Sequence, residues 1–212
     1  MIRRLLTPEE EQVKLSIKSI SDGHHRVMYR GVKAARCPFD YVIYQMIIFN
    51  LKPDLVIEIG TNAGGGALYL ADLMSITDHG IVHTIDITSQ CARIAATHPR
   101  VRLFTEGWQN YDLREVVGYS KVLVIEDGSH MYEETLTAMQ RFAPIVTVGS
   151  YMIVEDGIIN KLGKTKNYHG GPLRAIREFL RSTKDFEVDR YWCDFFGKNA
   201  TFNVNGYLKR MR

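Results

Sequence analysis

The sequence has 212 residues and a mass of 24.3 kDa, with 45% hydrophobic and 24% charged residues. This size and composition fit one globular domain over residues 1–212, with enough apolar residues for a substantial core. The formal net charge of +3 is small and no run of five or more basic residues occurs, so the composition favours neither nucleic acid nor a membrane surface as a partner.

The cysteines and the N-terminus bear on the cellular compartment. Cys37, Cys91 and Cys193 are widely spaced and form no C-x-x-C pair, which argues against a disulfide framework and against a zinc knuckle. The first ten residues lack the apolar core of a signal peptide. No apolar stretch reaches the roughly 20 residues that cross a bilayer. We therefore expect a cytoplasmic protein.

Residues 1–53 are predicted to form a helical cap or lid region. Thr7-Pro8-Glu9-Glu10 is typical of a helix start, with Thr as cap, Pro at the first position and acids that complement the helix dipole. Val13, Ile17 and Ile20 would give this helix an apolar face, which offers a surface for a homo-oligomer. Ser21-Asp22-Gly23 is expected to end it.

The next segment has a different pattern. Residues 24–38 show little periodicity and are predicted to be a loop or lid, as is the later stretch 161–171. Apolar residues recur at helical spacing over 40–51, and Lys52-Pro53 closes that helix.

From residue 54 onward, predicted strands alternate with predicted helices. This alternation indicates an α/β fold, a Rossmann-like mostly parallel sheet with helices on both faces, over residues 54–212. Strands are predicted within residues 54–60 and at 81–87, 101–104, 121–126 and 151–154, with weaker candidates at 186–188 and 200–203. Helices are predicted around residues 68–74 and at 91–97, 111–117, 131–142 and 173–181. Ligands of such sheets bind outside the carboxyl ends of the strands.

The first of these strands ends in a glycine turn, Glu58-Ile59-Gly60-Thr61-Asn62-Ala63-Gly64-Gly65-Gly66. Asn62 replaces the second glycine of the dinucleotide fingerprint G-x-G-x-x-G. The acid-x-Gly-x-x-x-Gly pattern resembles the first motif of S-adenosylmethionine-dependent methyltransferases, and a cationic sulfonium tolerates Glu58 better than a pyrophosphate does. An ordinary strand-to-helix turn is the alternative. The expected cofactor contacts of this turn are Glu58, Gly60, Thr61, Asn62, Gly64 and Gly65.

The ends of the next two strands supply further expected cofactor contacts. Asp86, followed by Ile87, is placed to accept hydrogen bonds from ribose hydroxyls. Gly107 and Trp108 are placed to line the adenine, with Trp108 stacking on it. A solvated strand-end Asp and an interface Trp are the corresponding alternatives.

Two later strands each end in an acid pair followed by glycine. These pairs are Glu126-Asp127-Gly128 and Glu155-Asp156-Gly157. Because one helical crossover joins the two strands, Asp127, Glu155 and Asp156 are expected to lie close together on the rim that carries the glycine turn. Clustered carboxylates resist joint ionisation unless a cation is present. An all-oxygen set favours Mg²⁺, with Ca²⁺ and Mn²⁺ as alternatives. Caps of the following helices are the structural alternative.

His130 follows Asp127 by three residues and is a candidate metal ligand or, one step further out, the general base. Asp127 is placed to touch both the metal and the cofactor rim.

Together these stretches resemble the family of cephalosporin-hydroxylase-like and rhamnosyl O-methyltransferases, over roughly residues 28–212. The similarity includes residues 31–45, 65–71, 148–156 and 202–210, while Gly66 stands where many members have Ser. The resemblance implies Mg²⁺ bound by Asp127, Glu155 and Asp156, with His130 as base. It also implies a small hydroxylated acceptor, a sugar or glycosylated metabolite.

The predicted function is therefore S-adenosylmethionine- and Mg²⁺-dependent O-methylation, with His130 and Asp127 as catalytic residues. Three alternatives stay open at this stage: an NAD-type dehydrogenase on the same sheet, a non-catalytic binding protein that retains the fold, and a metal-dependent hydroxylase as in the family name. The sequence lacks the two-His-one-carboxylate set expected of an iron oxygenase.

Overall fold

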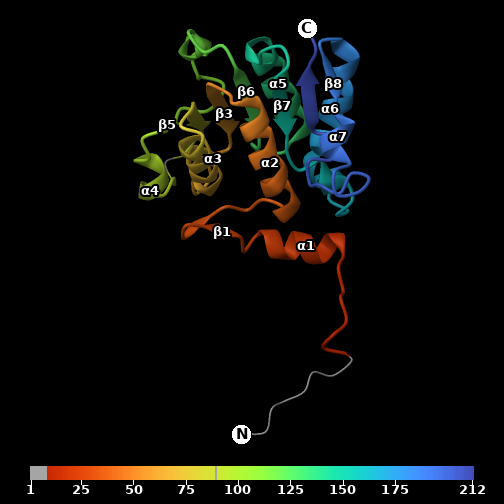
Figure 1. Cartoon of the computed structure of the whole chain (residues 1–212). Helices are drawn as coiled ribbons and strands as arrows, with labels where there is room; N and C mark the ends of the chain where they lie inside the picture. The colour runs from red at the N-terminus through yellow and green to blue at the C-terminus, as the bar shows by residue number, and fades with distance from the viewer. Residues whose placement is uncertain (1–8, 89) are drawn as a thin grey trace, which may run out of the picture.

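The computed structural model describes residues 9–88 and 90–212, and its centre is a seven-stranded sheet in the order β5-β4-β3-β6-β7-β9-β8 (Figure 1). The strands β3, β4, β5, β6 and β7 run parallel, and β9 is antiparallel to both β7 and β8. The bounds are β3 Leu55–Ile59, β4 Ile81–Ile85, β5 Val101–Phe104, β6 Val122–Glu126, β7 Tyr151–Val154, β8 Phe186–Val188 and β9 Tyr207–Arg210. The prediction of an α/β fold with a mostly parallel sheet is confirmed.

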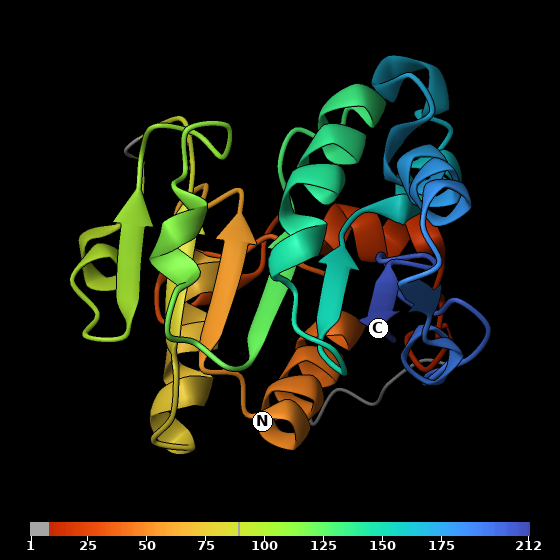
Figure 2. The same cartoon turned by 90° about the horizontal axis from the view of Figure 1, so that it is seen from above.

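Helices cover both faces of the sheet (Figure 2). Helices α2 (Pro38–Leu51) and α3 (Gly65–Ile76) pack on one face, and α5 (Tyr132–Phe142) and α6 (Gly171–Ser182) pack on the other. Side chains alternate along each strand, so Val56 and Leu123 face α2 while Leu55 and Val122 face α5. The remaining short elements are α4 Arg93–Ala96, α7 Arg190–Cys193, η1 Leu113–Val116, η2 Ala143–Ile145, η3 Gly157–Asn160 and η4 Thr165–Tyr168.

The N-terminal part crosses the sheet at the end where α2 begins (Figure 1). It contains α1 (Ile17–His24) and a hairpin of β1 (Met28–Tyr29) and β2 (Val32–Lys33). The predicted loop over 24–38 is thus partly wrong, because Arg30 and Gly31 take left-handed φ values of 47° and 79° and turn the chain into a hairpin.

The predicted first helix starts too early. Thr7 and Pro8 lie outside the described residues, and residues 9–16 are not helical. The helix begins at Ile17 because Ser16 and Ser19 form a capping box, in which each side chain accepts the other residue's backbone N–H.

Two further predictions are corrected. The strand expected over 200–203 does not form, because residues 201–203 are buried bends, and the strand in this region is β9, which was not predicted. The bend follows from buried Asp40 in α2, which accepts the Thr201 hydroxyl and the backbone N–H of Phe202. The helix expected over 111–117 is only the 3₁₀ turn η1.

Within residues 9–88 and 90–212, none of the helices combines the length and the apolar character that a membrane crossing requires.

Asp40 makes stability depend on pH. Burial raises the pKa of Asp40 from an ordinary value of 3.8 to about 7, although its hydrogen bonds oppose the shift. A carboxyl group whose pKa is higher in the folded state than in the unfolded chain stabilises the folded state fully at pH values below its pKa in the unfolded chain. This stabilisation is lost as the pH rises through its pKa in the folded state. We predict that the free energy of unfolding falls between pH 5 and pH 8, by about 2 kcal/mol from this group.

The measurement is urea unfolding at both pH values for the unsubstituted protein and for Asp40→Asn. The free energy of unfolding should fall less between the two pH values in Asp40→Asn. It should fall by the full amount in Asp78→Asn, because the Asp78 side chain is 94% exposed. An unchanged fall in Asp40→Asn would contradict the assignment.

Candidate active site

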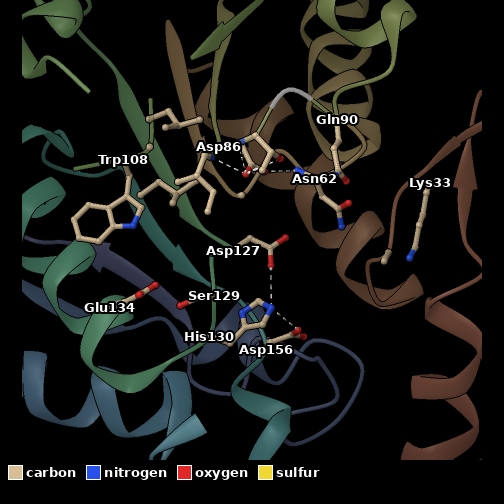
Figure 3. Close-up of a pocket in the computed structure, with 18 of the residues that line it drawn as sticks. Lys33, Asn62, Asp86, Gln90, Trp108, Asp127, Ser129, His130, Glu134 and Asp156 are labelled. Atoms are coloured by element: carbon tan, nitrogen blue, oxygen red, sulfur yellow. Dashed lines mark hydrogen bonds and ion pairs between the residues drawn. The ribbon is translucent and has the colours of Figure 1, made fainter. Parts of the chain in front are cut away.

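A cavity of about 620 Å³ lies at the carboxyl ends of the parallel strands (Figure 3). Residues from the loops after β3, β4, β5, β6 and β7 line one side, and the N-terminal segment supplies His24, His25, Lys33 and Ala35 on the other. All four lie within residues 24–38, which were predicted to be a loop or lid, but His24 and His25 were not predicted to be site residues. Seven of the predicted cofactor contacts line this cavity: Gly60, Asn62, Asp86, Ile87, Gly107, Trp108 and Asp127.

Gly60 lets two strand ends approach closely. Its φ is +101°, and a Cβ at this position would lie 1.9 Å from the carbonyl oxygen of Asp127. The backbone N–H of Asp127 in turn donates to the carbonyl of Ile59 at 2.9 Å. The glycine turn therefore sits directly against the end of β6, and no larger residue fits at position 60.

Asp86 organises the cofactor side of the cavity. Its carboxylate accepts the backbone N–H groups of Asn62 and Ile87, each at 2.7 Å. Oδ1 also accepts the Thr88 N–H at 3.3 Å, whereas Oδ2, which accepts the Asn62 N–H, has a further lone pair for a ligand hydroxyl. Ile87 is 74% exposed although apolar, and it lines the cavity together with Trp108, as Figure 3 shows for the labelled tryptophan. This part of the cavity suits a ligand with polar hydroxyls beside a flat apolar ring.

Gly64 and Gly65 serve packing and line neither this cavity nor the small one beside it. A Cβ at Gly64 would lie 2.5 Å from Cys91 Sγ, and a Cβ at Gly65 would lie 2.3 Å from the carbonyl oxygen of Lys33. The hairpin is therefore seated directly on the start of α3, which places Lys33 and the following residues at the cavity wall.

Glu58 and Thr61 line a small second cavity that shares Gly60, Asn62 and Asp127 with the first. Glu58 is buried and accepts the Thr84 hydroxyl at 2.7 Å, and Thr84 is hydrogen-bonded to Thr61 at 2.7 Å. Burial raises the pKa of Glu58 to about 7, even though a nearby arginine lowers it.

Asp127, His130 and Asp156 form a half-buried cluster of polar side chains. One ligand atom from each lies within 4.8 Å of the others. His130 Nε2 is 3.3 Å from Asp156 Oδ2 and 3.9 Å from Asp127 Oδ1, the arrangement drawn in Figure 3. Both His130 and Asp156 have left-handed φ values, 60° and 58°, which non-glycine residues adopt rarely and mainly at functional positions.

Glu155 lies apart from this cluster. Its carboxylate accepts hydrogen bonds from the Tyr44 hydroxyl at 2.7 Å and from Arg36 Nε at 3.3 Å, and it is 4% exposed. It also forms an ion pair with Arg36 Nη2 at 2.7 Å. Arg36 Nη2 also lies 3.5 Å from Glu58 and 3.6 Å from Asp127. Sequence reasoning missed Arg36 as a member of the site.

The alternation of side chains along the strands contains a signal from which a buried cation such as Arg36 could have been predicted. Glu58, Asp127 and Glu155 follow the strand residues Val56, Ile125 and Ile153, which all face α2. Three acids on one buried face require a cation from the element that covers that face.

The fold and the site together define the chain as a Rossmann-like enzyme of the class I methyltransferase type. The family model described as Rhamnosyl O-methyltransferase/CmcI matches residues 23–211. A rhamnosyl O-methyltransferase of Mycobacterium leprae (strain TN) is 28% identical over 99% of this chain and 98% of its own length. One of Mycobacterium bovis (strain BCG / Pasteur 1173P2) is 30% identical over 87% of this chain and 78% of its own.

Solved structures have the same fold. A structure of CmcI with Mg and S-adenosylmethionine superposes with a TM-score of 0.67 at 21% identity, covering 89% of this chain and 78% of that chain. The chain belongs to the rhamnosyl O-methyltransferase/CmcI family. Because it belongs to this family, the chain is an S-adenosylmethionine-dependent methyltransferase. The alternative of an NAD-type dehydrogenase is therefore excluded.

The close contact between the hairpin and the start of α3 can be tested by a substitution at Gly65. We predict that Gly65→Ala destabilises the protein by about 1–3 kcal/mol, because the added methyl group overlaps backbone that cannot rotate away. The matched control is Gly23→Ala in α1, where a Cβ meets nothing within 4 Å and stability should be unchanged or slightly higher. Urea unfolding of both variants measures the difference, and equal stabilities would contradict the close packing.

Proposed function

We propose that this protein transfers a methyl group from S-adenosylmethionine to a hydroxyl of a sugar or glycosylated metabolite, with a divalent cation, Mg²⁺, in the site. The observation that carries the proposal is the cluster of Asp127, His130 and Asp156 at the edge of the cavity that the glycine turn lines. Family membership and the names of the curated relatives support a sugar acceptor.

The residues fit S-adenosylmethionine. The cavity of about 620 Å³ offers the Asp86 carboxylate beside the apolar Ile87 and Trp108, and its volume is in the range of ligand pockets. The buried Glu58 carboxylate lines the adjoining small cavity and suits the ammonium group of the methionine part.

The residues also fit a hard divalent cation. Burial and the neighbouring Glu155 carboxylate raise the pKa of Asp127 well above its usual range. A cation between the Asp127 and Asp156 carboxylates would remove this penalty, and their oxygen atoms are the ligands that Mg²⁺ prefers. Glu155, which the structure pairs with Arg36, would be a third ligand if its carboxylate turned away from Arg36.

In the proposed reaction the bound cation supplies Lewis-acid polarisation of the acceptor hydroxyl. Asp127 and Asp156 fix the acceptor oxygen at the mouth of the cofactor cavity, which lowers the entropy cost of the encounter. His130 Nε2 takes the hydroxyl proton, the acceptor oxygen forms a bond to the methyl carbon, and the carbon–sulfur bond breaks to leave S-adenosylhomocysteine.

The Asp127→Asn variant tests whether a divalent cation bound at Asp127 is required for activity. We predict that release of S-adenosylhomocysteine with a panel of sugar and glycosylated acceptors requires Mg²⁺ and falls at least about 100-fold in this variant. Asp78→Asn on the surface is the matched control and should remain fully active. Full activity of the unsubstituted protein in chelator, or of Asp127→Asn, would contradict the proposed metal role.

His130→Gln separates the base from a metal ligand. As a base, its loss should lower kcat by about 10²–10⁴-fold while the affinity for Mg²⁺ stays unchanged, because Gln cannot take the proton. Calorimetric titration with Mg²⁺ in the presence of S-adenosylhomocysteine measures that affinity. A parallel loss of affinity and kcat would identify His130 as a ligand instead.

A further inference from the structure

Arg36 is buried among three acids that come from three different strand ends. Only 4% of its side chain is exposed. Its guanidinium binds Glu155 through two nitrogens, with Nη2 at 2.7 Å from Oε1 and Nε at 3.3 Å from Oε2. Glu58 and Asp127 lie at 3.5 and 3.6 Å from the same Nη2.

The surroundings of Arg36 hold it in this position. Its guanidinium lies 4.6 Å from the ring centre of Tyr44, whose hydroxyl donates to the same Glu155 carboxylate. A Cβ at Gly66 would lie 2.3 Å from Glu58 Oε1 and 3.3 Å from Arg36 Nη2, so a residue with a side chain would disturb this pair. Gly66 thus leaves the space that Arg36 and Glu58 occupy.

One positive charge cannot balance all the neighbouring carboxylates. Asp127 belongs both to the Arg36 group and to the cluster with His130 and Asp156. Arg36 and a divalent ion at that cluster therefore compete for Asp127, and for Glu155 when Glu155 is a ligand. Glu58 remains with Arg36 in either case, so the arginine keeps a buried partner.

We propose that Arg36 is an internal counter-cation, which neutralises Asp127 and Glu155 when no divalent ion is bound and yields them to the ion when it binds. Arg36 is then a positioning residue through which the N-terminal segment takes part in metal binding. This inference rests on the proposed function, because it assumes a divalent ion at Asp127.

The test compares the thermal response to Mg²⁺ of the unsubstituted protein and three variants. In Arg36→Met the metal-free form loses its counter-cation while the metal-bound form keeps the ion, so the rise in Tm on adding saturating Mg²⁺ should be about twice that of the unsubstituted protein. Arg36→Lys keeps the charge and should respond nearly like the unsubstituted protein. Arg30→Met is the matched control, because Arg30 lies in the hairpin that precedes Arg36 and pairs with Asp72 at 2.9 Å, away from the cluster. It should lower Tm equally with and without Mg²⁺.

The results separate this proposal from the metal role itself. A Mg²⁺ response of equal size in the unsubstituted protein and in Arg36→Met would overturn the counter-cation alone. No response in either protein would overturn both. If Arg36→Met is unfolded in chelator, circular dichroism should show refolding on adding Mg²⁺. A protein that stays unfolded in both buffers would also count against the proposal.

Discussion

Three carboxylates on one face of neighbouring strands have to be neutralised at the edge of the sheet, and the arrangement of the site follows from that constraint. Glu58, Asp127 and Glu155 come from the ends of β3, β6 and β7, and all project toward α2. Such charges are tolerated only with a cation and with hydrogen bonds to their remaining lone pairs. Arg36 and Tyr44 supply part of this compensation, and the Asp127–Asp156 pair still favours a further cation.

The same constraint connects the N-terminal segment to the sheet. The hairpin is seated on α3 through Gly65, and it carries Arg36 into the carboxylates and Lys33 to the cavity wall. The main cavity, the cluster of Asp127, His130 and Asp156, and the N-terminal wall of the cavity are therefore in contact and cannot vary independently. Asp127 is the common member, since it lines both cavities and lies 3.6 Å from Arg36 and 3.9 Å from His130.

Much of the fold could be predicted from sequence because each parallel strand is a short apolar run that ends at an acid or a glycine. Predicted and observed bounds of β5, β7 and β8 agree. The predictions failed where tertiary contacts determine the local structure. The Ser16 cap shortens the first helix, Asp40 bends residues 201–203, and the pairing of β9 depends on its neighbours β7 and β8. The predicted strand ends located Asp127 and Asp156. Arg36 was missed because it lies in the link between β2 and α2, where the sequence shows no periodicity.

A crystal grown with S-adenosylhomocysteine and Mn²⁺ would locate the cation directly through its anomalous scattering. The account predicts one strong peak bound by oxygen atoms of Asp127 and Asp156, with the Arg36 guanidinium withdrawn from Asp127 and still beside Glu58. A crystal with bound S-adenosylhomocysteine and saturating Mn²⁺ but no peak between these two carboxylates would contradict it.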